Sequence, residues 1–306
     1  MNEDKNVKRL CIYHGNCADG FGAAYAVWKR YGNEVEFHAG VYQDSPPDVT
    51  GKDVILVDFS YKRAVLEEMA KTARTITILD HHKSAADDLC DYQSFPDGTD
   101  RMYMDFISFA EKAQAVGVLP IRALFDMNRS GAVIAWQYFH PERNIPLLLA
   151  HIQDRDLWRF LLSNTREIQA CVFSHPYDFH VWDALILRAE DDAEYSSMVS
   201  EGKAIERKHF KDIDELLKVV TTRMVIGGYD VPVANLPYTM CSDAGHKLAH
   251  GEPFAACYYI TQDVTVFGLR SVEGGIDVSE IAKKYGGGGH KHAAGFRLPK
   301  WRVAGL

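Results

Sequence analysis

The feature of this chain that most constrains its fold is a repeat of short apolar runs, each followed at once by a residue that can bind a metal ion. The runs and the residues that follow them are 10–13 with His14, 54–57 with Asp58, and 76–79 with Asp80. Runs of this length are typical of buried strands, and segments with a helical pattern separate them. Such an alternation predicts a mostly parallel sheet, whose strands all end along one edge. Ligands of α/β proteins bind at that edge, so the three residues predict a site there.

The segments between and after these runs predict helices on both faces of the sheet. Residues 21–28 follow a glycine-rich turn and indicate a buried helix, while residues 64–73 carry an apolar stripe at helical spacing. Residues 101–160 are expected to be mainly helical. The predicted fold class is therefore α/β.

A change in composition marks the predicted domain boundary. Residues 191–220 are strongly charged and carry apolar residues at helical spacing, as a connecting helix would. Beyond them, residues 223–234 and 254–270 are rich in strand-forming residues. The predicted parts are a catalytic domain over residues 1–195, a helical linker over 196–221, and a smaller α/β domain over 222–306.

The chain has 306 residues and the composition of an ordinary globular protein, with 47% hydrophobic and 25% charged residues. No run approaches the roughly 18 consecutive apolar residues of a membrane span, and the polar start lacks the apolar segment of a signal peptide. We therefore expect a cytoplasmic protein without a membrane partner. The six cysteines are scattered and form no CxxC pair, which argues against a zinc knuckle and against a secreted disulfide framework.

The charge balance bears on the class of ligand. The chain has 34 Lys and Arg against 42 Asp and Glu, a formal net charge of −8. Proteins that bind long nucleic acid usually carry a basic patch, so a long duplex is not an expected partner. Phosphate substrates remain compatible with this acidity, because bound divalent cations would reverse the local field.

The third apolar run ends on Asp80, His81 and His82, a group that is unusual for its adjacent histidines. An aspartate after a strand often caps the next helix, and a single histidine is often a satisfied polar group in a core. Two imidazoles beside a carboxylate offer more: a metal ligand, an orienting partner for it, and a group that can face phosphate.

The first two runs supply further oxygen and nitrogen ligands. His14 and Asp19 lie in a tight loop whose glycines let the backbone curl around an ion. Asp58 adds a carboxylate that could bridge two cations. Two divalent ions roughly 3.5–4 Å apart clamp a phosphoryl centre and lower the pKa of a shared water, so that it attacks at neutral pH.

A run of four glycines, 286–289, precedes His290 near the end of the chain. The end of a helix would explain Gly286 alone. Four glycines exceed that need, and their amide N–H groups could form an anion-binding nest with His290 as a further donor.

Five ordered motifs together resemble the DHH phosphoesterase superfamily, including its DHH-associated C-terminal domain. The motifs begin at His14, Asp58, Asp80, Asp154 and Gly286, and the resemblance runs from about residue 9 to residue 298. The chain resembles the oligoribonuclease and nucleotide phosphoesterase branch more than the large exonucleases, which carry additional domains.

The resemblance implies a role for each motif residue. The implied ligands of two manganese ions, for which Mg²⁺ or Co²⁺ could substitute, are His14, Asn16, Asp19, Asp58, His81 and Asp154. Asp58 would bridge the ions, while the catalytic pair would be His82, facing the substrate phosphate, and Asp80, supporting the site. The implied substrate-binding residues are Arg270, Ser271, Gly287, Gly288, Gly289 and His290.

Two points of the ligand set stay open. Many members have an aspartate where this chain has Asn16, and an uncharged amide oxygen binds a hard cation more weakly. This leaves the occupancy of one metal open. Motif alignment favours Asp154 over Asp156 as the ligand from the fourth motif.

The expected function is a manganese-dependent phosphoesterase, a hydrolase that cleaves short oligonucleotides or small nucleotides. The alternative enzymes are a hydrolase of cyclic dinucleotides, of phosphoadenosine phosphate or of polyphosphate. The alternative from another class is a nucleotide-binding sensor with weakened turnover, which Asn16 motivates. The sequence does not specify cleavage polarity, and it leaves homodimerisation open.

Overall fold

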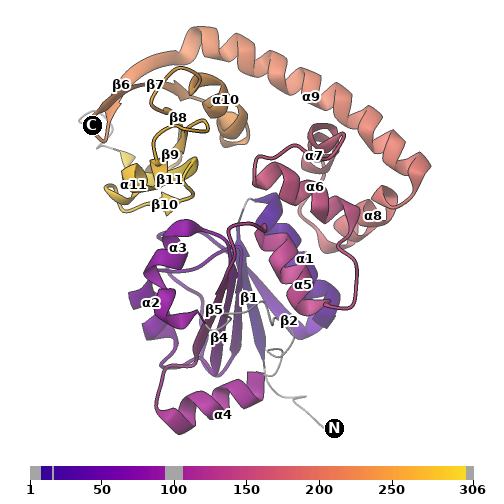
Figure 1. Ribbon diagram of the computed structural model, residues 1–306, viewed down its shortest axis with the longest axis vertical. Helices are drawn as coiled ribbons and strands as arrows, with labels where there is room; N and C mark the ends of the chain where they lie inside the picture. The colour runs from indigo at the N-terminus through magenta and orange to yellow at the C-terminus, as the bar shows by residue number, and fades with distance from the viewer. Residues whose placement is uncertain (1–7, 16, 94–105, 301–306) are drawn as a thin grey trace. The chain divides into compact units, whose positions relative to one another are not determined.

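The computed structural model describes residues 8–15, 17–93 and 106–300. The chain divides into two compact units, an N-terminal unit of Met1–Ile205 and a C-terminal unit of Glu206–Leu306. The division falls within the longest described helix, α9, which spans Asp192–Val220 (Figure 1).

The N-terminal unit is built on a sheet of five parallel strands in the order β2-β1-β3-β4-β5. The strands are β1 Arg9–His14, β2 Val35–Gly40, β3 Asp53–Val57, β4 Thr75–Asp80 and β5 Ile121–Phe125. The three predicted apolar runs form β1, β3 and β4, which are the three central strands. The prediction of a mostly parallel α/β sheet is confirmed.

The two edge strands, β2 and β5, are not predicted by the sequence. Residues 106–160, the described part of the segment expected to be mainly helical, do carry three helices, but residues 121–125 form the unpredicted strand β5 beside β4. Arg122 interrupts this short apolar run, although its side chain is buried and donates to Thr77 Oγ1. A prediction based on runs of apolar residues misses a short buried strand that contains a charged residue.

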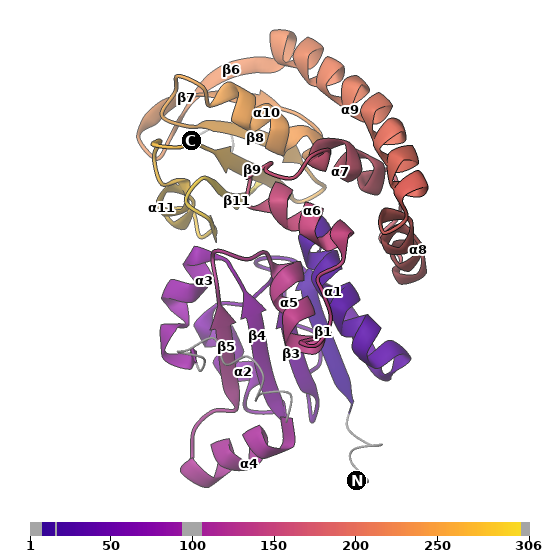
Figure 2. The ribbon, with the colours of Figure 1, turned by 45° about the vertical axis from the view of Figure 1, so that its right-hand side comes forward.

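Alternate residues of the central strands contribute to two separate cores, as the twofold repeat of a strand requires. In β3, Ile55 and Val57 pack with α1 and α5, whereas Val54 and Leu56 pack with α2. Figure 1 and Figure 2 show α1 and α5 on one side of the sheet and α2 and α3 on the other. These helices are α1 Ala18–Tyr31, α2 Arg63–Met69, α3 Lys83–Asp88 and α5 Gly131–Phe139.

The remaining elements of the N-terminal unit extend the core on the α1 and α5 side. Leu148, Ile168 and Trp182 contribute to this core from α6, α7 and α8. The remaining elements are η1 Gly32–Glu34, η2 Cys90–Tyr92, α4 Phe106–Val116, α6 Leu147–Asp156, α7 Thr165–Phe173 and α8 Phe179–Ala189.

The C-terminal unit has a mixed sheet of six strands in the order β10-β11-β9-β8-β7-β6. Its neighbours are antiparallel except β7 and β8. Its elements are β6 Thr221–Ile226, β7 Tyr229–Asn235, η4 Tyr238–Met240, α10 Cys241–Leu248, β8 Ala255–Ile260, β9 Val264–Arg270, α11 Val278–Lys283, β10 Gly288–Gly289 and β11 Ala293–Pro299. The two predicted strand-rich segments correspond to β6 to β9. Part of the glycine run forms β10, which the sequence does not predict.

Candidate metal centre

Asp58 follows β3 directly and leaves the strand in an uncommon backbone conformation. Its φ is 53°, in the left-handed region that residues other than glycine seldom adopt. Its amide donates to the carbonyl of Leu79 in β4 at 2.9 Å, which holds the turn in place. Backbone strain of this kind persists where the surrounding structure determines it, and it is concentrated at functional sites.

Asp58 lies in a group with two other buried residues, Asp19 and His81, and with Asp156, which is exposed. The Nε2 atom of His81 lies 3.0 Å from Asp58 Oδ1, 3.5 Å from Asp19 Oδ2 and 3.5 Å from Asp156 Oδ2. Asp156 has the most exposed side chain of the four, at 26%. Three carboxylates therefore surround one imidazole at the carboxyl ends of the strands.

A second group shares Asp58 with the first. His14 Nδ1 lies 3.5 Å from Asp58 Oδ2, and His82 Nδ1 lies 3.9 Å from Asp58 Oδ1. Ligand atoms of His14, Asp58 and His82 all lie within 4.8 Å of one another, as do those of Asp19, Asp58 and His81. Asp58 thus belongs to two overlapping sets of potential ligands.

Asp80 holds the two adjacent histidines in position. Its Oδ1 atom accepts from the backbone amide of His81 at 2.7 Å and lies 2.7 Å from His82 Nδ1. An ionised carboxylate only accepts hydrogen bonds, so Nδ1 of His82 carries the proton in this contact. The pairing fixes the imidazole orientation, as carboxylate partners do in many metal sites.

Burial and mutual repulsion set the electrostatics of this cluster. Burial, followed by the charges of Asp58 and Asp156, raises the pKa of Asp19 well above its ordinary value. Burial also raises the pKa of Asp156. Burial would likewise raise the pKa of Asp58, but the imidazoles of His14 and His81 hold it well below the usual range. For His81, the nearby carboxylates outweigh burial and raise the pKa well above its ordinary value.

The residues present fit divalent cations. Asp58 Oδ1 is buried, and the nitrogen beside it, His81 Nε2 at 3.0 Å, does not make a hydrogen bond of good geometry to it. A buried carboxylate oxygen whose hydrogen bonding is incomplete is costly, and a bound cation would offset that cost. Carboxylate oxygens with imidazole nitrogens suit manganese, magnesium and cobalt.

The structure distinguishes Asp154 from Asp156. Both carboxylate oxygens of Asp154 are engaged away from the cluster, where they accept from the amides of Leu161 at 2.8 Å and Leu162 at 3.0 Å and from Thr165 Oγ1 at 2.6 Å. Two residues correspond to a rotation of about 200° around a helix, so Asp154 and Asp156 point to different sides of α6. The structure brings Asp156 to His81 and does not bring Asp154 there. This geometry favours Asp156 as the ligand, whereas motif alignment favours Asp154.

Gly131, at the start of α5, is a residue of the site that sequence reasoning misses. Its amide donates to Asp19 Oδ2 at 2.6 Å, and the next amide, of Ala132, donates to Asp19 Oδ1 at 3.1 Å. A Cβ at position 131 would lie 2.4 Å from the Cβ of Asp58, so only glycine leaves room for that side chain. The available signal is a glycine directly after Ser130, the N-cap residue that accepts from Val133.

Tyr42 also lies beside the cluster without having been predicted. The centroid of its ring is 5.3 Å from that of His14 and 6.0 Å from that of His82. Tyr42 is 39% exposed as a residue. Asn16, the remaining predicted ligand of this unit, lies outside the described residues.

The predicted substrate-binding residues of the C-terminal unit are engaged with their own unit. Arg270 Nη1 donates to the Leu269 carbonyl at 2.9 Å, and Ser271 Oγ donates to the Ile276 carbonyl at 2.8 Å. Gly288 and Gly289 pair with β11, and the His290 amide donates to the Ala293 carbonyl at 2.8 Å. Gly287, the remaining predicted residue, directly precedes β10.

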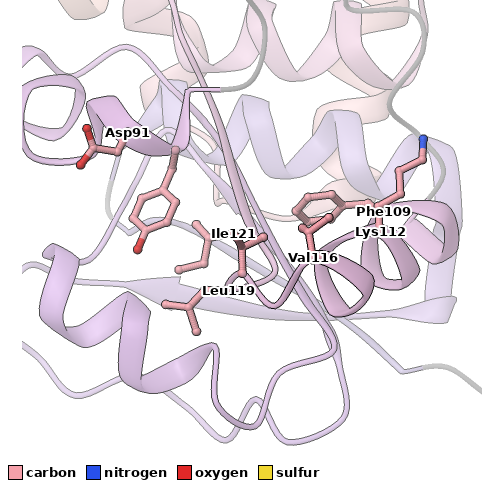
Figure 3. Close-up of a pocket in the computed structure, with 9 residues that line it drawn as sticks. Asp91, Phe109, Lys112, Val116, Leu119 and Ile121 are labelled. Atoms are coloured by element: carbon pink, nitrogen blue, oxygen red, sulfur yellow. The ribbon is translucent and has the colours of Figure 1, made fainter.

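A pocket of different character lies near the beginning of β5 (Figure 3). Its walls are mainly apolar, and Ile121 is the first residue of the strand, whereas the metal-ligand cluster lies at the strands' other ends. The lining residues are Asp91, Tyr92, Phe109, Lys112, Ala113, Val116, Val118, Leu119 and Ile121. They do not combine the several carboxylates and imidazoles that the strand ends bring together.

Comparisons with known proteins agree with this architecture. The DHHA1 domain family matches residues 245–304. An uncharacterized protein of Acanthamoeba polyphaga mimivirus is 30% identical over 316 residues, which cover 95% of this chain and 68% of that protein. The solved DHH domain of a member of a ribosomal protein family covers 97% of this chain and 84% of its own, with a TM-score of 0.55 and 12% identity.

The fold and the strand-end cluster define an α/β protein equipped to bind metal ions. Together with the DHHA1 match and the mimivirus relative, they place the protein in a family: the chain belongs to the DHH superfamily, a superfamily of phosphoesterases. Among the described residues, no helix is both long and apolar enough to span a membrane.

Proposed function

We propose that this protein is a manganese-dependent phosphoesterase that hydrolyses short oligonucleotides or small nucleotides. The observation that carries the proposal is the position of Asp58, a buried carboxylate shared by two sets of potential ligands at the ends of parallel strands. A shared carboxylate with nitrogen and oxygen ligands on either side is the arrangement that a two-metal phosphoesterase needs.

The residues proposed to hold the ions are Asp19, Asp58, His81 and Asp156 on one side and His14 and Asp58 on the other, with Asn16 as a further candidate. Divalent ions bound there would neutralise charge on the phosphoryl oxygens and lower the pKa of a nearby water. The three carboxylates around His81 provide the negative charge that retains such ions.

His82 is proposed to contact the substrate phosphate, and Asp80 to position it. The contact between Asp80 Oδ1 and His82 Nδ1, 2.7 Å long, fixes the orientation of the His82 ring. An imidazole held in this way can donate a hydrogen bond to a phosphoryl oxygen as charge develops on it.

Two observations support a nucleotide substrate. Tyr42 presents a partly exposed aromatic ring beside His14 and His82, and such rings stack on nucleobases. The net charge of −8 gives little attraction for a long polyanion. In the C-terminal unit, Arg270, Ser271, the glycines 287–289 and His290 are proposed to bind the substrate, because a guanidinium and backbone amides suit phosphate.

A panel of substrates tests this function. Initial rates would be measured with manganese on dinucleotides, longer single strands, cyclic dinucleotides, phosphoadenosine phosphate and polyphosphate. We expect the highest kcat/KM on dinucleotides or other short strands, no cleavage of duplexes, and no cleavage after chelation of the metal. Preference for polyphosphate would contradict the nucleotide proposal while retaining the phosphoesterase class.

The competing proposal is a sensor that binds nucleotides without turnover, which the uncharged Asn16 favours. Binding of a nucleotide in the presence of manganese, with no product released from any substrate of the panel, would establish the sensor. The Asp58→Asn variant is the control for both proposals, since it removes charge from the shared ligand at nearly constant volume.

A further inference from the structure

A second group of metal-binding side chains lies in the N-terminal unit and shares no residue with the strand-end cluster. It consists of Cys171 in α7, His175 just beyond the end of α7, and Glu201 in α9. One ligand atom of each residue lies within 4.8 Å of the others. Cys171 Sγ donates to Glu201 Oε2 at 3.5 Å.

The local backbone brings these three residues together. The chain turns directly after α7, where the His175 amide donates to the Val172 carbonyl at 3.0 Å, and this turn keeps His175 near Cys171. Glu201 is 26 residues further along the chain, and α9 brings it to these two residues by packing closely on α7. A Cβ at Gly202 would lie 1.8 Å from the Glu167 carbonyl oxygen, so the two helices meet there through their backbones.

The polar atoms of the group are only partly satisfied. His175 Nε2 is buried and makes no hydrogen bond with any residue that the structure describes. Cys171 is fully buried, whereas the Glu201 side chain is 43% exposed. A buried imidazole nitrogen without a partner, beside a thiol and a carboxylate, is costly for the apo protein and becomes favourable when a cation is bound.

We infer that Cys171, His175 and Glu201 form a separate site for a thiophilic divalent cation, of which Zn²⁺ is the natural candidate. A thiolate, an imidazole and a carboxylate are the three types of zinc ligand. In a tetrahedral site their donor atoms would be roughly 3.3–3.8 Å apart, given bond lengths of about 2.0–2.3 Å. Small rotations of the side chains reach that spacing, and the exposed side of Glu201 admits the ion and a water as the fourth ligand.

The surrounding charges bear on how tightly this site binds. Arg188 Nη2 lies 4.0 Å from Glu201 Oε2, and Arg188 Nε contacts Glu194 at 3.0 Å. The Arg188 guanidinium reduces the affinity of the site for a cation. Because Arg188 lies closer to Glu194 than to Glu201, we expect the Glu201 carboxylate to be able to rotate toward the ion. Burial and the Glu201 carboxylate raise the pKa of the Cys171 thiol to about 11, so an entering ion displaces a proton from sulfur.

The site would link α7 to the first part of α9. A cation there would tie together two helices that otherwise meet through packing and the contacts of Arg188. We therefore expect Zn²⁺ to stabilise the N-terminal unit without taking part in phosphate chemistry.

Cobalt substitution tests the proposal, because a thiolate ligand gives Co²⁺ a charge-transfer band that oxygen and nitrogen ligands do not. The titration would use the full chain carrying Asp58→Asn, which weakens the strand-end centre. We expect the band to saturate at one Co²⁺ per chain and to disappear in Cys171→Ser. Loss of one ligand in His175→Gln or Glu201→Gln should weaken Co²⁺ binding by about 100-fold or more.

Two cysteine variants serve as controls. Cys90→Ser removes an exposed thiol outside the group, and Cys17→Ser removes the thiol nearest to His14. Both should keep the band. No band in the Asp58→Asn chain, persistence of the band in Cys171→Ser, or its loss in Cys17→Ser would each overturn the proposal, the last by placing the thiolate at the strand-end centre.

A second measurement covers the case in which Cys171→Ser folds poorly. Zn²⁺ should raise the Tm of the Asp58→Asn chain and of its Cys90→Ser form, and should have a much smaller effect on its His175→Gln form. Equal shifts in Tm for all three would contradict a site at His175.

Discussion

Two regions carry candidate functional residues: the strand ends of the N-terminal unit and the β9 to β11 region of the C-terminal unit. The two regions differ in what these residues contact. At the strand ends, most of the candidates are buried and they lie close to one another, so that the carboxylates of Asp19, Asp58 and the more exposed Asp156 surround His81. In the C-terminal unit, the candidates contact their own backbone neighbours: Arg270 donates to Leu269, and Gly288 pairs with Gly295.

This difference teaches which features of a fold point to a ligand. Like charges held close together destabilise a folded protein, and cations bound at the strand-end cluster would offset that repulsion. In the C-terminal unit, Gly288 and Gly289 pair with β11, and Arg270 donates to the backbone of its own strand. The structure of the sheet explains these contacts without a ligand. Packing and charge therefore support a candidate metal centre at the strand ends, whereas substrate binding by the C-terminal unit has no comparable structural support.

The largest expected effect comes from removing the shared ligand. Asp58→Ala should lower kcat/KM by at least about 10³-fold, or roughly 4 kcal/mol of transition-state stabilisation, because both ion sites lose a ligand. The fold should survive in metal-free buffer, since the change removes a buried charge. Steady-state kinetics and circular dichroism measure the two outcomes, with the exposed Asp263→Ala as control. Near-normal activity of Asp58→Ala would contradict the proposal that the strand-end carboxylates bind the catalytic ions.

The two aspartates of α6 sharpen the contrast within the N-terminal unit. Asp156→Ala should weaken manganese binding by about 100-fold with little loss of stability, because its carboxylate faces His81. Asp154→Ala should cost about 2–4 kcal/mol of unfolding free energy, because three donors lose their acceptor. Calorimetric titration and urea unfolding separate the two effects. The reverse pattern would restore Asp154 as the ligand.

The adjacent histidines should separate binding from turnover. His81→Ala should weaken manganese affinity by about 10- to 100-fold, since His81 lies among the carboxylates. His82→Ala should keep the affinity nearly unchanged and lower kcat by about 100-fold, since Asp80 fixes the His82 ring and we propose that His82 contacts the substrate phosphate. Equal losses of affinity in the two variants would show that this division of roles is wrong.

A smaller effect is expected from the C-terminal unit. Arg270→Ala should lower kcat/KM on short oligonucleotides by about tenfold, the loss of one charge-assisted contact, and leave manganese affinity unchanged. Arg270→Lys is the matched control, because it keeps the charge and loses the planar pair of donors. A change in manganese affinity in Arg270→Ala would remove the contrast between an ion-binding unit and a substrate-binding unit.

The smallest effect concerns the uncharged residue of the first motif. Asn16→Asp should tighten manganese binding by a few fold, because a charged oxygen binds a hard cation more strongly. Calorimetric titration against the unaltered chain measures the change. Unchanged or weaker binding would place Asn16 outside the set of ligands.

The central architecture could be predicted because β1, β3 and β4 are continuous apolar runs. Strands buried on both faces have little polar sequence, and a parallel arrangement brings their carboxyl ends to one edge. His14, Asp58 and Asp80 follow these runs directly, so their convergence is a consequence of local sequence and sheet topology. Adjacent histidines after the same strand extend this argument to His81 and His82.

Other features depend on contacts between segments that are distant in the chain, and only the tertiary structure decided them. Asp154 and Asp156 have the same side chain two residues apart, and their roles differ because α6 turns one toward Thr165 and the other toward His81. Gly131 is required by the position of Asp58, 73 residues earlier in the sequence. Cys171 and Glu201 meet because α9 comes close to α7 at Gly202. Local sequence does not predict contacts of this kind, because they depend on the free energy of packing the whole chain.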